Sequence, residues 1–195
     1  MCMAFTQRSE RSRAAILASA RQLLTAKGYE GTTIRAVAAE AGIDPSMVMR
    51  YYGSKEGLFA AAVDIDLMLP ADAANWPRER LGEGLARHFV SRWEGDLSDE
   101  LITMLLRSAS TNPAAAERLR TVFASQVLEF VGMVAPDAVP RRAGMIGSQV
   151  LGLALCRYVL ELPPVVAMDG DTLARTLAPV LQHYLTGDLG APVAG

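Results

Sequence analysis

Apolar residues recur at helical spacing along almost the whole chain, and no segment shows the alternation that is typical of a strand. In the first third, this spacing predicts helices over about residues 9–27, 33–41, 44–51 and 54–69. The apolar stripes of the first, second and fourth helices are Ile16, Leu17, Ala20, Leu23 and Leu24; Ile34, Val37, Ala38 and Ala41; Leu58, Phe59, Ala62, Ile65 and Leu69.

Capping residues indicate where these helices begin and end. Gly28 stands where a left-handed residue would end the first helix. Thr33 and Ser54 are good N-caps for the second and fourth. Asp44 caps the third, with Pro45 at the first helical position, where its missing N–H costs least. Gly42 makes the turn before it.

Five more helices are predicted, over about residues 77–93, 99–110, 112–134, 141–162 and 171–186. The last would start at a cap on Asp171, and Pro179 inside it should bend it. We therefore predict an all-α protein of about nine helices.

Bulk properties favour a globular cytoplasmic protein. The chain has 195 residues, of which 51% are hydrophobic. Its longest charge-free apolar run in the C-terminal half, Ala143–Cys156, is too short to span a bilayer, so no membrane partner is expected. The two cysteines, Cys2 and Cys156, lack zinc or redox spacing.

The net charge of −2 hides an asymmetry. Residues 1–59 hold eight Lys/Arg against five Asp/Glu, which is +3, and the remaining eleven and sixteen give −5 for residues 60–195. This split points mildly to a polyanion-binding N-terminus, and chance scatter of surface charge explains it equally well.

Three short helices with a tight turn before the third form a helix-turn-helix arrangement, which places its second helix in the DNA major groove. Residues 28–59 resemble the DNA-binding domain of the tetracycline-repressor (TetR) family through Gly31-Thr32-Thr33, Val37-Ala38, Ala41-Gly42, Tyr51-Tyr52 and Ser54-Lys55-Glu56. The segment departs from the family pattern at Met49, where tyrosine is most frequent, and at Ser46, where glycine is frequent.

The resemblance implies a DNA-binding domain over residues 1–55 and a ligand-binding and dimerisation domain over residues 56–195. The implied protein is a homodimeric repressor that leaves a double-stranded DNA operator when a small, largely apolar effector binds. It would need no metal or cofactor.

The face of the third helix that carries Pro45, Ser46, Met47 and Arg50 is predicted to contact DNA. Arg50 suits a guanine edge or a phosphate, and Met47 suits a thymine methyl. The hydroxyl of Tyr51 suits a phosphate oxygen. Alternatively, Tyr51 is a partly buried aromatic residue that seals the motif.

Lys55 is unusual because a cation in the first turn opposes the helix dipole. It would be useful there if it held a phosphate together with the free N–H groups. A solvated lysine paired with Glu56 is the alternative. Thr33 can likewise face the DNA backbone, and Arg35 is exposed by helical phase and within reach of DNA or of solvent alone.

The segment Val150–Leu155 is apolar nearly all round, and Gly147 and Gly152 would allow close packing of a second chain. A central helix buried in its own monomer would show the same pattern. With the family resemblance, we predict dimerisation through residues 141–162 and 171–186, with the interface residues Leu151, Leu155, Tyr158, Leu177 and Leu181.

An effector pocket is expected among large and flexible apolar residues, although such residues are more often ordinary core. His88 and Arg157 are the polar candidates for orienting a ligand. The full candidate set is His88, Phe89, Trp93, Met104, Phe123, Met133 and Arg157.

Two rival functions are an enzyme and a ligand sensor that has lost DNA binding. The two histidines, His88 and His183, form no metal-ligand motif, and the chain has neither a phosphate loop nor a nucleophile elbow. Cys156 lies in an apolar helix, where a thiol is usually inert. The intact caps and basic residues of 33–55 argue against lost DNA binding.

Overall fold

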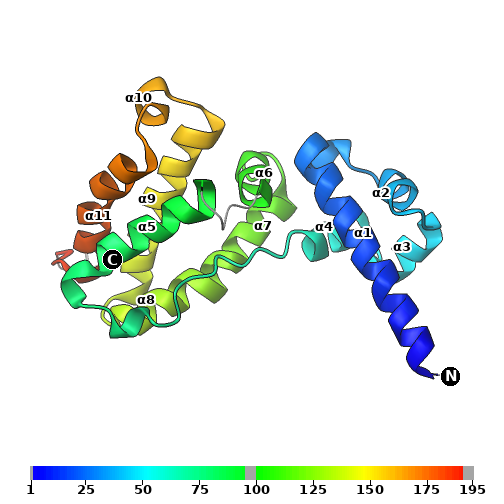
Figure 1. Ribbon diagram of the computed structural model, residues 1–195, viewed down its shortest axis with the longest axis horizontal. Helices are drawn as coiled ribbons and strands as arrows, with labels where there is room; N and C mark the ends of the chain where they lie inside the picture. The colour runs from blue at the N-terminus through cyan, green and yellow to red at the C-terminus, as the bar shows by residue number, and fades with distance from the viewer. Residues whose placement is uncertain (1, 95–99, 191–195) are drawn as a thin grey trace, which may run out of the picture. The chain divides into compact units, whose positions relative to one another are not determined.

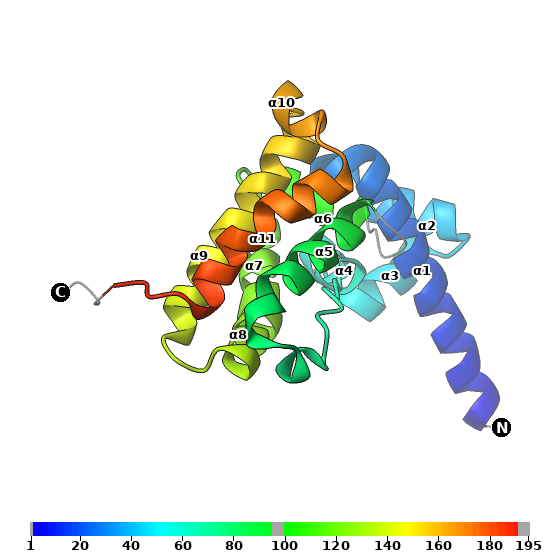
Figure 2. The ribbon, with the colours of Figure 1, turned by 60° about the vertical axis from the view of Figure 1, so that its left-hand side comes forward.

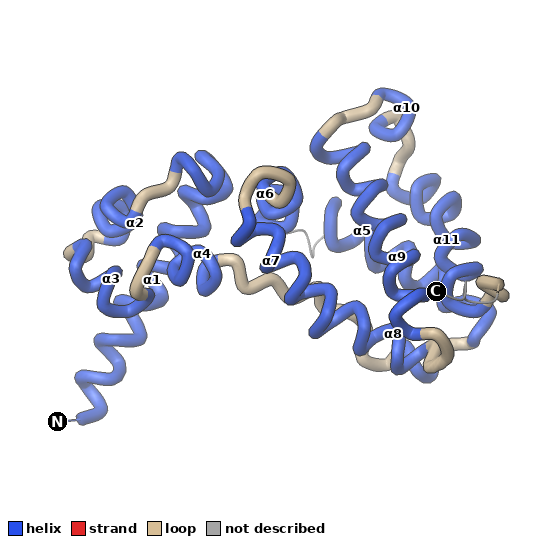
Figure 3. Tube along the Cα trace, turned by 180° about the vertical axis from the view of Figure 1, so that it is seen from behind, coloured by secondary structure: helices blue, strands red, loops and turns tan. Residues whose placement is uncertain are grey.

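The computed structural model describes residues 2–94 and 100–190, with the backbone alone for residues 2–8. Throughout these ranges the regular structure is helical, without strands, which confirms the predicted all-α class (Figures 1 and 3). The chain divides into two compact units, one made of 1–65 and 100–119, the other of 66–99 and 120–195. The boundary was predicted at residue 55, whereas residues 55–62 and 100–108 belong to the first unit here, because they pack with its N-terminal helices.

The first unit contains α1 (Cys2–Gly31), α2 (Ile34–Ala41), α3 (Pro45–Tyr52), α4 (Lys55–Ala62), α6 (Glu100–Ser108) and the start of α7 (Pro113–Val122). Gly28 interrupts α1 with a φ of 68°, as predicted for the end of that helix. The predicted stripes supply much of its core, where Ile16 and Val37 are completely buried, and Val48 of α3 is completely buried beside them.

Helix α4 ends at Ala62, whereas the apolar spacing predicted a helix up to Leu69. Two arginines donate hydrogen bonds to carbonyl groups at the C-terminal end of α4. Nε of Arg21 donates to the Ala62 oxygen at 2.8 Å, and Nε of Arg118 donates to the Val63 oxygen at 2.6 Å. Cations at a helix C-terminus satisfy its free carbonyls and its dipole. Residues 64–70 continue without regular structure, as the tan segment after α4 in Figure 3 shows.

The second unit is built from α5 (Leu81–Glu94), a π-helical turn η3 (Phe123–Val127), α8 (Leu128–Val134), α9 (Val139–Ala154), a second π-helical turn η4 (Leu155–Val159), α10 (Pro163–Val166) and α11 (Gly170–Thr186). Short 3₁₀ turns over 73–75 and 78–80 precede α5. The helix predicted over 141–162 ends at Val159, and α10 was not predicted. Asp169, not Asp171, caps α11: its Oδ1 accepts from the Thr172 N–H at 2.7 Å.

Helices α5 and α11 cross closely in the core of this unit (Figure 2). A Cβ on Gly82 would lie 2.4 Å from the Ala178 oxygen, so only glycine fits at the crossing. The Gly82 N–H donates to Oε1 of Gln182 at 2.8 Å. A buried arginine, Arg142, then closes the C-terminal end of α11 by donating to the Tyr184 oxygen at 2.8 Å.

Among the described residues, no single helix is both long and apolar enough to cross a bilayer. Pro113–Val134 and Val139–Val159, which are bent by 117° at their junction, meet the criteria of length and composition only as a pair.

Candidate nucleic-acid interface and effector cavity

Side-chain caps begin α2 and α3, and one left-handed glycine turns the chain between them. Oγ1 of Thr33 accepts from the Ala36 N–H at 3.1 Å, and Oδ1 of Asp44 accepts from the Ser46 N–H at 2.8 Å. Gly42 has a φ of 65°, which favours glycine. These contacts, which join residues two or three positions apart, cap the two helices and place the turn between them.

Helix α3 turns one face inward and leaves the other in solvent. Val48 is completely buried, whereas Pro45, Ser46 and Arg50 are exposed and Met47 is half-buried. The Ser46 hydroxyl donates to Oδ1 of Asp44 at 2.6 Å, so it already serves the cap. Pro45, Ser46 and Arg50 were predicted to face DNA, whereas Met49, which is 44% exposed, was not.

Tyr51 lies between α3 and α1 at the edge of this face. Its hydroxyl accepts from Oγ of Ser9 at 3.3 Å, and the guanidinium carbons of Arg13 and Arg50 lie 5.0 and 5.6 Å from the ring centroid. The Ser9 hydrogen bond, with the charges of the two arginines, lowers the pKa of the Tyr51 hydroxyl. The half-buried ring thus lies at the edge of the motif with two cations close to it.

The Lys55 ammonium lies 4.2 Å from the centroid of the Tyr29 ring. The Tyr29 hydroxyl donates to Oε1 of Glu56 at 3.1 Å, and burial, reinforced by this acceptor, raises the pKa of Tyr29 to about 12. The aromatic ring therefore holds Lys55 at the N-terminus of α4 by a cation–π contact. The alternative given in the sequence analysis was a solvated Lys55 paired with Glu56.

Arg13 of α1 lies next to the ring of Tyr51 on α3, although the sequence predicted no site residue on the first helix. A cluster of basic residues near the N-terminus, Arg8, Arg11 and Arg13, was the available signal. Which of them reaches α3 depends on the angle between α1 and α3. The structure answers this for Arg13, whereas the Arg8 side chain lies outside the described residues. Thr33 and Arg35 are exposed at the start of α2, as predicted.

The second unit contains an apolar cavity of about 90 Å³ between α5, η3, α8 and α9. Among the predicted pocket residues, His88, Phe89 and Trp93 line it. The other four lie elsewhere. Met104 is buried in α6 of the first unit. Met133 borders a groove outside the cavity, with Leu69 and Phe130.

Phe123 and Arg157 also serve other contacts. The Phe123 ring fills the space that a Cβ on Gly147 would need. Arg157 is paired with Glu94 and donates to the Val165 oxygen at 2.5 Å, which ties η4 to α10. Pairing with Glu94 is the main cause that raises the pKa of the Arg157 guanidinium.

Two polar side chains of α5 hold residues 66–69, which we call the strap. Nε2 of His88 lies 2.9 Å from the Leu67 oxygen, and Nη2 of Arg92 donates to the Asp66 oxygen at 2.8 Å. From the other side, the Leu67 N–H donates to Oε1 of Gln126 at 2.7 Å. Arg92 was not predicted, because its role depends on a backbone segment 26 residues away.

The predicted interface residues differ in how exposed they are. Leu151 and Leu155 of α9 and η4 are 37% and 38% exposed, large values for leucine. Tyr158 stacks on Trp93 with ring centroids 4.8 Å apart. Leu177 and Leu181 are buried within their own unit, where α11 packs on α5, so a second chain could reach them only after repacking.

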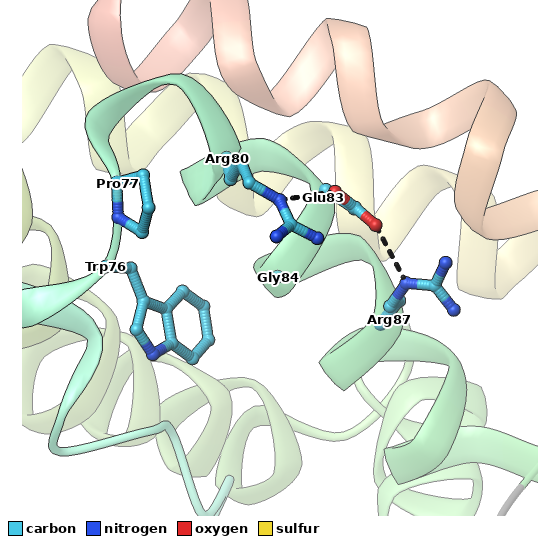
Figure 4. A pocket seen from close by; sticks show the side chains of 6 residues that line it. All are labelled: Trp76, Pro77, Arg80, Glu83, Gly84 and Arg87. Carbon is cyan, nitrogen blue, oxygen red and sulfur yellow. Dashed lines mark hydrogen bonds and ion pairs between the residues drawn. The ribbon is translucent and has the colours of Figure 1, made fainter.

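A shallow surface pocket lies at the start of α5 (Figure 4). The Trp76 ring covers Gly84, and Glu83 accepts from Nε of Arg80 at 3.1 Å and from Nε of Arg87 at 3.2 Å. These arginine side chains are 67% and 60% exposed, so the ion pairs contribute little to stability.

Comparison with known proteins agrees with this geometry. The family description "Bacterial regulatory proteins, tetR family" matches residues 16–62, and "Tetracyclin repressor-like, C-terminal domain" matches residues 79–185. A search of curated proteins gives no match.

Several solved structures are similar over nearly the whole chain. A TetR-family regulator from Streptomyces coelicolor A3 shares 29% identity, with a TM-score of 0.53, over 90% of this chain and 95% of that chain. A second from that organism shares 20% identity, with a TM-score of 0.68, over 90% and 98%. The multidrug binding protein EbrR, complexed with ethidium, shares 23% identity, with a TM-score of 0.67, over 89% and 97%.

A capped helix-turn-helix followed by a larger helical unit defines a DNA-binding regulator. Since the C-terminal description alone covers more than half of the chain, this protein belongs to the tetracycline-repressor (TetR) family. It is a DNA-binding transcriptional regulator, and the regulators of this family are not enzymes.

Proposed function

We propose that this regulator is a homodimeric repressor that binds a palindromic operator and leaves it when a small, largely apolar effector enters the cavity of the second unit. The observation that carries the proposal is the pairing of an exposed basic face around α3 with an internal apolar cavity in the other unit. DNA binding alone needs only the first of these two features.

On the DNA side, Arg50, Ser46 and Pro45 are exposed on α3, where base edges would lie. Arg13, Tyr51 and the N-terminus of α2 suit phosphate oxygens, because they combine cations, a hydroxyl and free N–H groups. Phosphate contacts position such a protein and base contacts specify its site. We therefore assign sequence reading to Arg50 and positioning to the other groups.

On the effector side, the cavity walls are mainly apolar, with His88 and Arg92 as polar groups. Such a cavity suits an apolar molecule with few polar atoms. The similar protein EbrR was solved in complex with ethidium, which supports the idea that this fold accommodates a small molecule. At about 90 Å³ the cavity must widen on binding, and this widening provides the conformational change that release from DNA requires.

Exposed leucines support the dimer. Leu151 and Leu155 lie one helical turn apart, and Met145 on the same helix is 40% exposed. A two-fold dimer through this face would use the same patch on both chains and would match a palindromic site.

The direct test is a gel shift with the DNA that flanks the protein's own gene, combined with sedimentation of the free protein. We expect a dimer at micromolar concentration and a discrete shifted band that competitor DNA does not remove. A stable monomer with unchanged DNA affinity would contradict the proposed dimer. If random DNA competes for the protein as well as the flanking DNA does, the proposal of a specific operator is wrong.

Coupling between the two ligands is tested in both directions. An effector that weakens operator binding must itself bind more weakly to the operator complex by the same factor, about 5–150-fold in typical cases. A ligand that binds tightly in the cavity and leaves DNA affinity unchanged would contradict the proposed release.

A further inference from the structure

The cavity of the second unit has a cation in its wall. Arg92 is only 6% exposed, and the other lining residues, apart from His88, are apolar or glycine. A buried guanidinium is costly unless strong acceptors face it, and a carboxylate is a stronger acceptor than a neutral carbonyl. A carboxylate oxygen in the place of the Asp66 oxygen, which Nη2 of Arg92 reaches at 2.8 Å, would therefore be the stronger acceptor for this guanidinium.

His88 and Arg92 are arranged as a pair. They lie four residues apart on α5, so they share one face of the helix. Their donors reach two consecutive carbonyl oxygens of the strap, those of Leu67 and Asp66, at 2.9 and 2.8 Å. Because a carbonyl can only accept, Nε2 of His88 carries a proton there. Burial lowers the pKa of His88, so the neutral imidazole acts as the donor.

The strap is held mainly by side chains of other elements. Besides His88 and Arg92, Oε1 of Gln126 accepts from the Leu67 N–H, and Met68 has a φ of 52°, which a residue other than glycine rarely adopts. Leu67 and Leu69 contribute their side chains to the cavity wall. Moving the strap would thus enlarge the cavity and uncover two donors in the same step.

We propose that the effector is a carboxylate with an apolar body, and that its two oxygens replace the strap carbonyls as acceptors for Arg92 and His88. This inference rests on the proposed function and names the chemical class of its effector. The apolar body takes the space that Leu67 and Leu69 leave. The strap follows Ile65 directly, where the chain passes from the DNA-binding unit to the second unit. Releasing the strap from His88 and Arg92 would therefore change the segment that connects the two units.

The test uses octanoate and 1-octanol as matched probes, with binding to the full-length protein measured by calorimetry. Octanoate should bind at least about ten-fold tighter than 1-octanol, because a hydrogen bond to a charged group is worth more than one to a neutral group. Arg92→Gln should weaken octanoate binding by about 10–100-fold and leave 1-octanol binding nearly unchanged. Arg92→Lys, which keeps the charge but not the planar fork, should fall between wild type and Arg92→Gln.

Arg87→Gln is the matched control: it removes the same charge from the same helix at an exposed site (Figure 4) and should bind both probes like the wild type. If Arg92→Gln does not fold, His88→Leu and Arg92→Lys carry the test, and His88→Leu should also weaken octanoate selectively. Circular dichroism of each variant establishes whether it folds.

Three results would overturn the carboxylate: equal binding of both probes, octanoate binding that Arg92→Gln and His88→Leu leave unchanged, and no binding of either probe at millimolar concentration. The proposed function is tested separately by the operator gel shift. If 1-octanol releases the operator as well as octanoate does, the proposal of a ligand-responsive repressor is supported and the proposal of a carboxylate effector is wrong. If octanoate binds through Arg92 without releasing the operator, the proposed carboxylate site is supported and the proposed effector-released repressor is wrong.

Discussion

The helix-turn-helix and the cavity place their polar groups in opposite ways. Around α3, Arg50 and Ser46 are exposed, and the caps that orient the helix join residues two or three positions apart. Around the cavity, His88 and Arg92 are half-buried and buried, and they hold backbone groups 21 and 26 residues away.

This difference predicts how each region tolerates change. Exposed groups with local partners can be removed with little loss of stability, so function and stability separate in the first unit. Buried groups that bridge distant segments hold the fold while they line the site, so function and stability are coupled in the second unit.

The largest effect is expected for Arg50→Ala in operator binding. If Arg50 reads a guanine, its loss costs roughly 1–3 kcal/mol per half-site on the operator and much less on random DNA. Fluorescence anisotropy at two salt concentrations measures both. Arg175→Ala, which removes an exposed cation from α11, should bind like the wild type. An equal loss on both DNAs would assign Arg50 to a phosphate.

Arg142→Met should destabilise the protein by about 1–3 kcal/mol, because it leaves two part-buried carbonyls at the end of α11 without their donor. Urea unfolding measures this. Arg35→Met in the helix-turn-helix is the contrasting variant and should stay within about 0.5 kcal/mol of the wild type. Similar losses for both would break the comparison between the two units.

The contact between Arg142 and Asp137 predicts that the stability of the fold depends on pH in the acid range. The hydrogen bonds from Arg142 hold the pKa of Asp137 below the ordinary value of 3.8. A carboxylate with a lowered folded-state pKa stabilises the fold above its unfolded pKa, and this stability is lost as the pH falls through the folded value. Melting temperatures recorded from neutral pH to below pH 3.8 should fall more steeply for the wild type than for Arg142→Met.

Two glycines in the second unit should respond with opposite signs. Gly82→Ala forces a Cβ against the backbone of α11 and should cost about 1–3 kcal/mol. Gly144→Ala, in an exposed and open position of α9, should stabilise by about 0.5–1 kcal/mol through helix propensity. Thermal melts measure both. A neutral Gly82→Ala would mean that α5 and α11 can separate slightly at low cost.

The smallest effect on stability is expected for Lys55→Ala. The cation–π contact with Tyr29 contributes about 0.5–1 kcal/mol, and the opposed helix dipole costs about 0.3–1 kcal/mol, so the two nearly cancel. If Lys55 touches a phosphate, operator and random DNA should weaken alike, with a salt slope reduced by about one per site. Unchanged binding on both DNAs would remove Lys55 from the interface.

The sequence alone determined the helix-turn-helix. Thr33, Gly42 and Asp44 act within their own turn, so their spacing was sufficient to predict α2, α3 and the exposure of Arg50. The buried stripes of the first unit were predicted for the same reason, since helical periodicity is a local property. The TetR family also followed from residues 28–59.

Where α4 stops and what surrounds the cavity depend on contacts between residues far apart in the chain. The stripe through Leu69 predicted one longer helix, but Arg21 and Arg118, distant in sequence, take the last carbonyls of α4. The residues beyond Ile65 then form the strap, whose Asp66 oxygen accepts from Arg92. In the sequence, Arg92 has the same local pattern as any other arginine of a helix, so this contact could not be predicted. Contacts between residues far apart in the chain depend on the packing angles of helices, and a periodic pattern specifies which face is buried but not what it is buried against.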